Sequence, residues 1–566
     1  MQKLRLVAVA IAFAGLAAGA SAQTFVSTNV TTNTTWGSAA NPSPIILQQP
    51  IFVTSNATLT ILAGTVVRGQ PRTGAVVPGS TLNTPGALIV TQSGRIVANG
   101  SASNPIIFTT AAVDNNNDGV ADDDDTNGFE DEFVLGDVFL DDTPATAPLA
   151  PLNDAGFSNV ALWGGVVVLG NAPTNLANKN GVGFGKGLVE GLTVPGFPAA
   201  DATYGGLEPH DNSGSLRFIS IRHAGDELGA SNELNGISLA GVGDGTTFEN
   251  VEVYCNFDDG IEWFGGTVNG KNLAVSFVGD DMFDLDEGYT GLNQFLFGVM
   301  PFFNENGGTA YGSLSGDKAG EFDGDNFRPD NVAFNDNVAV RRELDGSAGF
   351  GGPGPLSGPG MYNMTVIGST PDAPLFFTPA SVAATNRGLQ ARNGFAGVVY
   401  NSIILNTGTE EGWEIAPVPA SEVPGFGVTD NANGGLISLV CSTFDDTGAL
   451  DALETTVVTN GNSLSTFLGG AAGGANTINV AAFPGLVNED QTFDPQGNAA
   501  GKLDATLKPS PINPRPNAGL TGTGSCVLPQ GPGLTKVTYR GAFDRTAPLL
   551  WTTDWTALNV GGLLAD

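Results

Sequence analysis

The feature that most constrains the fold is a phrase that recurs after 22 residues in the middle of the chain. Asn256-Phe-Asp-Asp-Gly-Ile-Glu-Trp-Phe-Gly-Gly266 is followed by Val278-Gly-Asp-Asp-Met-Phe-Asp-Leu-Asp-Glu-Gly288. A unit of this length holds two or three short strands and cannot bury its apolar side alone, so neighbouring units must stack. The repeat therefore predicts a β-solenoid in which each coil is one unit. A propeller blade would need roughly twice this length.

Short strands separated by turn residues extend this pattern in both directions. Two strands flank a glycine turn within 57–69, and others lie in 87–91, 94–98 and 105–109. Upstream, Asn235-Gly-Ile-Ser-Leu precedes Asp259-Gly-Ile-Glu-Trp by 24 positions, as expected for a coil with a slightly longer turn. Alternating β-rich runs bounded by Gly, Asn, Asp and Pro are typical of strands rather than helices. We therefore expect an all-β chain of stacked coils, interrupted by long Gly/Pro/Asn-rich insertions.

Three phrases add a family resemblance to this pattern. They are Leu-Trp-Gly-Gly-Val-Val-Val-Leu-Gly at 162–170, Ile-Arg-His-Ala-Gly at 221–225 and Asn-Glu-Leu-Asn-Gly at 232–236. With the coil repeat, they resemble uncharacterised exported bacterial proteins with a right-handed parallel β-helix, within the pectate-lyase-like superfamily. The resemblance covers about 50–450 and implies the fold. It does not imply an activity, because this superfamily includes lyases, hydrolases, adhesins and structural fibres.

The ends of the chain differ from its middle. Lys3 and Arg5 precede an apolar run over 6–19, and Ala20-Ser21-Ala22 has the small residues of a cleavage site. This pattern predicts a signal peptide over 1–22, and the run is too short for a membrane span. We expect a β-helix over 23–450 and an irregular region over 451–566, whose aromatic end forms a cap over the last coil. The mature chain, without a transmembrane anchor, is then secreted, extracellular or held at the cell surface.

Charge narrows the range of partners. The formal net charge is −35, with 57 acidic and 22 basic residues. Such a field repels nucleic acid, and it either simply keeps the protein soluble or binds calcium, which prefers oxygen ligands. Among the three cysteines, Cys441 and Cys526 form the more plausible disulfide, and Cys255 lies in a strand pattern as a small buried residue.

A calcium-type loop is predicted at 114–125. Its oxygen ligands fall at loop positions 1, 3, 5, 7, 9 and 12, with Gly119 at the sharp turn; in order they are Asp114, Asn116, Asp118, the carbonyl of Val120, Asp122 and Asp125. Position 12 is Asp rather than the longer Glu, which puts the affinity in doubt. The alternative is an acidic loop without an ion.

The coil repeat itself predicts a second group of acids. Where Ile261, Trp263, Phe283 and Leu285 point inward, alternate residues point outward; these are Asp258, Glu262, Asp280, Asp284 and Asp286. Stacking by one coil places Asp258 over Asp280 and Glu262 over Asp284, about 4.8 Å apart. Carboxylates this close repel, so a cation bridges them or one keeps its proton. Asp259 and Asp281, with Asn235, are expected to cap turns in a polar ladder.

Two functions remain open from the sequence. One is a calcium-stabilised surface or extracellular protein that binds polysaccharide or a partner protein without catalysis. The other is a calcium-dependent polysaccharide lyase or glycoside hydrolase that uses the outward acids, with Arg222 or His223 as helper. Exposed aromatic side chains beside the acids, such as Trp263 or Tyr289, would favour the enzyme. An uncapped coil end would favour a third possibility, self-assembly.

Overall fold

The computed structural model describes the following parts of the chain: residues 23–37, 44–74, 83–113, 159–176, 185–189, 192, 199–229, 232–300, 318–324, 359–368, 387–405, 412–416, 437–444, 477–478, 513–516, 533–562 and 564.

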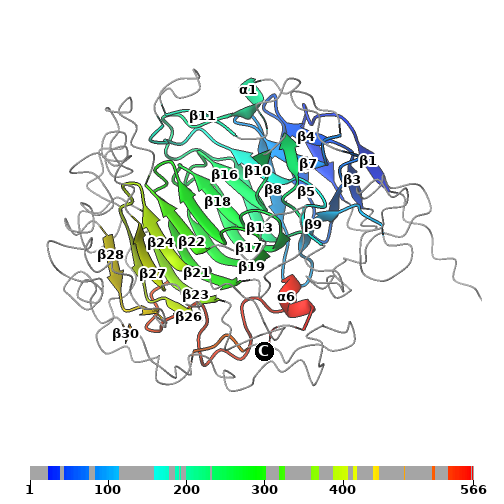
Figure 1. Cartoon of the computed structure of the whole chain (residues 1–566). Helices are drawn as coiled ribbons and strands as arrows, with labels where there is room; N and C mark the ends of the chain where they lie inside the picture. The colour runs from blue at the N-terminus through cyan, green and yellow to red at the C-terminus, as the bar shows by residue number, and fades with distance from the viewer. Residues whose placement is uncertain are drawn as a thin grey trace, which may run out of the picture.

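Short parallel strands form two extended sheets (Figure 1). The first, sheet A, has 17 strands within the described residues: β1 (Thr24–Val26), β2 (Thr34–Trp36), β3 (Ile45–Leu47), β5 (Thr58–Ile61), β6 (Val66–Gly69), β8 (Arg95–Asn99), β9 (Ile106–Thr110), β13 (Gly214–Arg222), β17 (Thr247–Asn256), β19 (Gly270–Val278), β21 (Leu292–Val299), β23 (Gly360–Ile367), β25 (Gly397–Tyr400), β26 (Ile403–Leu405), β28 (Ile437–Val440), β29 (Thr443–Phe444) and β30 (Thr477–Ile478).

The second, sheet B, has nine strands in the part of the chain that the structure describes: β4 (Pro50–Val53), β7 (Ala87–Val90), β10 (Gly165–Leu169), β16 (Ile237–Ala240), β18 (Ile261–Phe264), β20 (Phe283–Asp286), β22 (Lys318–Asp323), β24 (Arg387–Arg392) and β27 (Trp413–Ala416). Two small antiparallel pairs lie outside these sheets, β11 (Gly187–Leu188) with β12 (Thr203–Tyr204) and β14 (Glu227–Gly229) with β15 (Asn232–Glu233). The helices of the described residues are one turn long, α1 (Ala199–Ala202) and α6 (Ala557–Val560).

Consecutive coils stack in parallel with the predicted period. Ile261 pairs with Phe283 in sheet B, and Val251 pairs with Leu273 in sheet A, each 22 residues apart. Every strand pair within sheets A and B is parallel, as a coil that climbs by one strand per turn requires. The fold is a right-handed parallel β-helix, which confirms the prediction.

Single residues in the left-handed conformation bend the long strands of sheet A. In β17 the bend is at Asn250 (φ 56°) and in β19 at Asn272 (φ 56°). The strand register places these two residues, and then Phe295 and Asn363, on successive coils. Asn tolerates this conformation better than most residues, so its recurrence at the bend is a local reason why the chain turns here.

The core runs along the interior of the coil. Ile261, Trp263, Phe283 and Leu285 are at most 1% exposed and belong to one continuous apolar cluster. Their inward orientation was predicted, and it forces the residues between them in β18 and β20 onto the outer face of sheet B. Burial of each such side chain contributes about 1.5–3 kcal/mol.

Two segments cover parts of the outside. Residues within 171–206 close an apolar cluster on sheet B that includes Val167, Leu169 and Tyr204. Residues 533–562 and 564, which we call the C-terminal strap, lie across sheet A, where Phe543 packs on Phe297 with ring centroids 5.0 Å apart. The sequence predicted a cap over the last coil, whereas the strap lies along the side of several coils, because apolar residues on the outer face of sheet A need cover.

Glu252 anchors the strap. Its carboxylate accepts hydrogen bonds from the backbone N–H groups of Ala557 (2.7 Å) and Leu558 (3.3 Å), at the start of α6, and from Ser220 Oγ (2.5 Å).

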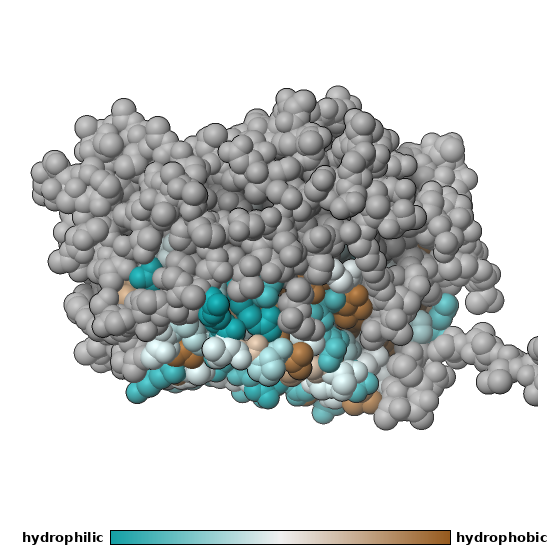
Figure 2. Space-filling model, turned by 90° about the horizontal axis from the view of Figure 1, so that it is seen from below, coloured by the Kyte–Doolittle hydropathy of each residue, from teal (hydrophilic) through white to brown (hydrophobic). Residues whose placement is uncertain are grey.

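The side of the molecule on which α6 lies shows, in its described part, hydrophilic residues interspersed with smaller hydrophobic areas (Figure 2).

The cysteines follow the expected division. Cys255 is buried and is not part of a disulfide, whereas Cys441 is disulfide-bonded. Cys526, the predicted partner of Cys441, lies outside the described residues. Among the described residues, no helix has the length and apolar character needed to cross a membrane.

Candidate functional site

A row of carboxylates runs across the outer face of sheet B. The strand register aligns Glu262 of β18 with Asp284 of β20 and then with Glu321 of β22. We call these three residues the acid row. Ser238 precedes the row and Gln390 follows it. The stacking of Glu262 over Asp284 confirms the prediction, and Glu321 extends it by one coil.

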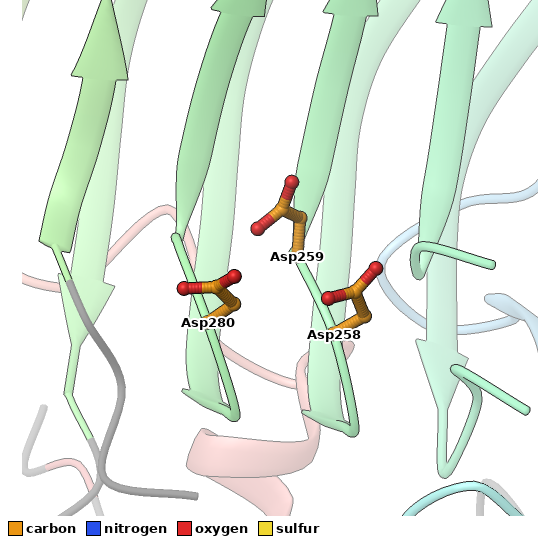
Figure 3. A group of neighbouring side chains, drawn as sticks. All are labelled: Asp258, Asp259 and Asp280. Atoms are coloured by element: carbon orange, nitrogen blue, oxygen red, sulfur yellow. The ribbon is translucent and has the colours of Figure 1, made fainter. Parts of the chain in front are cut away.

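A second group of acids lies in the turns that lead into β18 and β20. Figure 3 shows Asp258 and Asp259 on one coil and Asp280 on the next, with all three carboxylates on the same side. One oxygen from each lies within 4.8 Å of the others. The same limit holds for Asp259 with Glu262 and Asp284. Asp259 therefore joins the turn acids to the acid row, and Asp258 and Asp280 come together as predicted.

Burial and like charge act in the same direction on these groups. Loss of hydration raises the pKa of Asp259 well above its usual value, and Asp258 and Asp284 add to the rise. The pKa of Glu262 is raised by burial and by Asp259, and that of Asp284 by burial and by Glu262. Without a cation, neutral pH therefore forces repelling charges together in a partly dry environment.

Two basic side chains lie beside the last acid of the row. Lys318 Nζ is 2.5 Å from a Glu321 carboxylate oxygen and 3.4 Å from Asp281. Arg392 forms ion pairs with Glu321 and, at 3.0 Å, with Asp323. These ion pairs neutralise the negative charge at the β22 end of the acid row. The excess negative charge of the row therefore lies at Glu262 and Asp284.

Several side chains beside the acid row have structural roles. Asp259 Oδ1 accepts a hydrogen bond from the backbone N–H of Asp281 at 2.9 Å, which confirms the expected turn cap. Asn235 donates through Nδ2 to Glu262 Oε2. Asp286, also outward, accepts from the backbone N–H of Glu287 at 2.6 Å. Capping thus explains one oxygen of Asp259 and does not explain the gathering of acids around it.

Two oxygens at the site lack a hydrogen-bond partner within the described part of the chain. They are Oδ1 of Asp284 and Oδ1 of Asn235, both buried. A buried oxygen without a partner costs about 1–3 kcal/mol. A hard cation satisfies such oxygens, and carboxylate and amide oxygens are the ligands that calcium takes. The residues present therefore fit a calcium ion.

An insertion from an earlier coil borders the acids. Tyr204 is 3% exposed and donates from its hydroxyl to Glu287 Oε2 at 2.6 Å. Its ring centroid lies 6.1 Å from that of Phe264, which projects outward beside Asp286 in the register of β18 and β20. Asn175 Nδ2 donates to the carbonyl of Gly324 at 2.7 Å. The insertion thus forms one wall of the acidic surface.

The predicted basic helpers lie elsewhere. Arg222 is 1% exposed in sheet A, where its Nε donates to Ser220 Oγ at 2.7 Å. His223 is fully buried, with Nδ1 2.7 Å from the carbonyl oxygen of Asn159. Neither side chain is accessible to a polymer in solution.

The predicted aromatic platform is also buried, and the other metal site is not described. Trp263 is 0% and Tyr289 1% exposed, with their ring centroids 5.4 Å apart. The calcium-type loop at 114–125 lies outside the described residues, so it stays a prediction.

Sequence reasoning missed Glu321, Lys318 and Arg392. Gly320-Glu-Phe-Asp323 repeats the alternation of acidic and apolar residues in Phe283-Asp-Leu-Asp286, and this repeat could have identified Glu321 from the sequence. The long insertion between the two phrases hides the 22-residue period.

Comparison with known proteins agrees with the fold. The family model of the pectate-lyase-like β-helix domain matches residues 29–120 and 153–417. The chain belongs to this family. No curated protein matches the sequence.

Among solved structures, the full-length tailspike protein 2 from Escherichia coli O157:H7 bacteriophage CAB120 is 11% identical, with a TM-score of 0.20. The match covers 80% of this chain and 44% of the tailspike chain, so this chain spans less than half of that protein.

Proposed function

We propose that this pectate-lyase-like chain is an exported binding protein that holds calcium at the acids of sheet B and contacts a polysaccharide there, outside the cell or at its surface. The observation that carries the proposal is the alignment of Glu262 and Asp284 on adjacent coils, with Asp259 within 4.8 Å of both. Calcium would be held by Asp259, Glu262 and Asp284, with Asn235 as an amide ligand.

The chemistry of the site supports a cation as the mediator. A bound calcium ion supplies positive charge on an acidic surface, and an anionic polymer could then approach despite a net charge of −35. Asn235 and Asp284 hold oxygens in place from two different coils, so the ion would also link those coils. The family name favours a polysaccharide over other polymers.

Two observations favour binding over catalysis. The aromatic residues that would stack on a sugar beside the acids, Trp263 and Tyr289, face the core. Arg392 is the basic side chain nearest to solvent beside the acid row. Burial lowers its pKa, but Glu321 and Asp323 outweigh that effect and raise it above its ordinary value. Arg392 therefore holds its proton and is a poor acceptor for the proton that a lyase must remove.

A glycoside hydrolase is the second candidate. It is favoured by the position of Glu262 among other carboxyl groups, where burial and Asp259 raise its pKa, because a general acid in such an enzyme is a carboxyl group whose pKa is raised.

The test measures calcium binding and polymer cleavage on the same sample. Calorimetric titration of the mature protein with calcium is expected to show binding that Asp284→Asn weakens at least tenfold. Incubation with acidic and neutral polysaccharides is expected to show binding without new reducing or unsaturated ends. Unchanged calcium binding in Asp284→Asn would contradict the proposed site, and new reducing ends that disappear in Glu262→Gln would establish the hydrolase instead.

A further inference from the structure

Acidic residues are absent from the first coils of the solenoid. Residues 1–113 contain no Asp or Glu, whereas 114–566 contain all 57 acidic residues and 17 of the 22 basic ones. In residues 23–113 the charged side chains are Arg68, Arg72 and Arg95. The first coils are therefore weakly basic in their own sequence and the rest of the chain is strongly acidic; Asp201 of the insertion reaches the first coils, where it accepts a hydrogen bond from Thr54 Oγ1 at 3.3 Å.

This end also presents a strand edge. Within the described residues, β1 pairs with β3 and β2 pairs with β5, and both lie at the start of the stack (Figure 1). In β2 the Trp36 carbonyl accepts a hydrogen bond from Leu62 N–H at 3.1 Å, on the side of the next coil. Alternate residues of a parallel strand direct their backbone groups to opposite sides, so Thr35 directs its N–H and C=O away from the stack.

The side chains of this coil do not protect the edge. Thr31, Thr32, Asn33 and Thr35 are exposed and uncharged. Natural edge strands are usually blocked by charged side chains, proline or a covering segment. The stretch 23–36 contains no charged residue and no proline. Cleavage after Ala22 would leave Gln23 as the residue directly before β1.

From the uncharged coil and its outward backbone groups, we infer that the N-terminal end is an interface for a second copy of this chain, joined end to end with the first. A two-fold axis would bring β1 and β2 of one copy against those of its partner as antiparallel edges, and such an interface closes at two subunits. The charge distribution favours a second copy as the partner, because contact through the two N-terminal ends keeps the acidic parts of the two molecules far apart. Contact through any acidic surface would bring them together.

The experiment compares the assembly of the mature protein, residues 23–566, with that of two variants. Thr35→Lys places a charge on the outward edge of β2, and the two-fold axis doubles it. Ser103→Lys adds the same charge at an exposed turn of the first coils and serves as the control. Sedimentation velocity over a hundredfold range of concentration measures the dissociation constant, and circular dichroism checks that each variant is folded.

We expect a dimer for the parent and for Ser103→Lys, with a dissociation constant at least tenfold higher for Thr35→Lys. Small-angle scattering is expected to give the dimer nearly twice the length of the monomer. A parent protein that is monomeric throughout, a dimer of monomer length, or a dimer that Thr35→Lys leaves intact would overturn the inference. Assemblies that grow beyond two copies would also overturn it, because they require a head-to-tail contact.

Discussion

Substitution of Asp284 by Asn tests the electrostatics of the acid row directly. Asp284 has a carboxylate oxygen within 4.8 Å of one from Glu262, and two charges at that distance repel by about 3.5 kcal/mol at an effective dielectric constant of ~20. Proton uptake relieves part of this repulsion, so we expect Asp284→Asn to stabilise the calcium-free protein by about 1–3 kcal/mol at pH 8. Added calcium should reverse the order, since an ion at 100 times its dissociation constant stabilises the parent by ~2.7 kcal/mol.

The assay is urea unfolding at pH 4 and pH 8, with chelator and with calcium. Asp554→Asn is the control, because Asp554 is exposed and lies in the C-terminal strap; its effect is expected to stay within about 0.5 kcal/mol. The reasoning fails if Asp284→Asn destabilises the calcium-free protein at pH 8, or if calcium stabilises parent and variant equally.

Three further predictions concern the same fold. In chelator, the parent protein should lose stability as pH rises, because the pKa of Asp259 is raised in the folded state. The stability that the Asp259 proton provides is complete below the pKa of the unfolded state and is lost as pH rises through the pKa of the folded state. Urea unfolding between pH 4 and pH 8 measures this loss. Glu252→Ala should cost about 3–5 kcal/mol, because it removes the buried negative charge that faces Arg222 and frees the N–H of Ala557, and limited proteolysis should then cut the strap first. Trp263→Ala should cost about 3–5 kcal/mol in urea unfolding, because it opens a cavity between coils.

The β-helix was predictable because its inner face follows a strict rule. Ile261 and Trp263 recur as Phe283 and Leu285 after 22 residues, and each coil repeats the same apolar positions because its neighbours supply the rest of the core. Alternation then fixes the outward side chains, so the stacking of Glu262 on Asp284 followed from the sequence.

What could not be predicted depends on contacts between segments far apart in the chain. Glu321 joins the acid row only because a long insertion returns the chain to the same register in β22. Arg222 and His223 were placed near the acids by their proximity in sequence. The fold instead puts Arg222 at the end of β13 in sheet A, near Glu252, and His223 directly after that strand, beside Asn159. The strap contacts Glu252 from 305 residues away, and no local pattern encodes that contact.

The position of the acids along sheet B follows from where its cover ends. The outer face is apolar at Val167 of β10, under the insertion, and becomes polar at Ser238 of β16 and acidic at Glu262 of β18. Val167, Ser238 and Glu262 occupy the same register position on three successive strands. A change of one outward residue per coil is therefore enough to convert an apolar surface into a charged one. Because the inward residues stay apolar throughout, a solenoid can build such a site without altering its core. The acids lie next to the apolar patch that the insertion covers, and Tyr204 and Asn175 of the insertion border them. The proposed function places the ion and the polymer at this boundary between covered and charged surface.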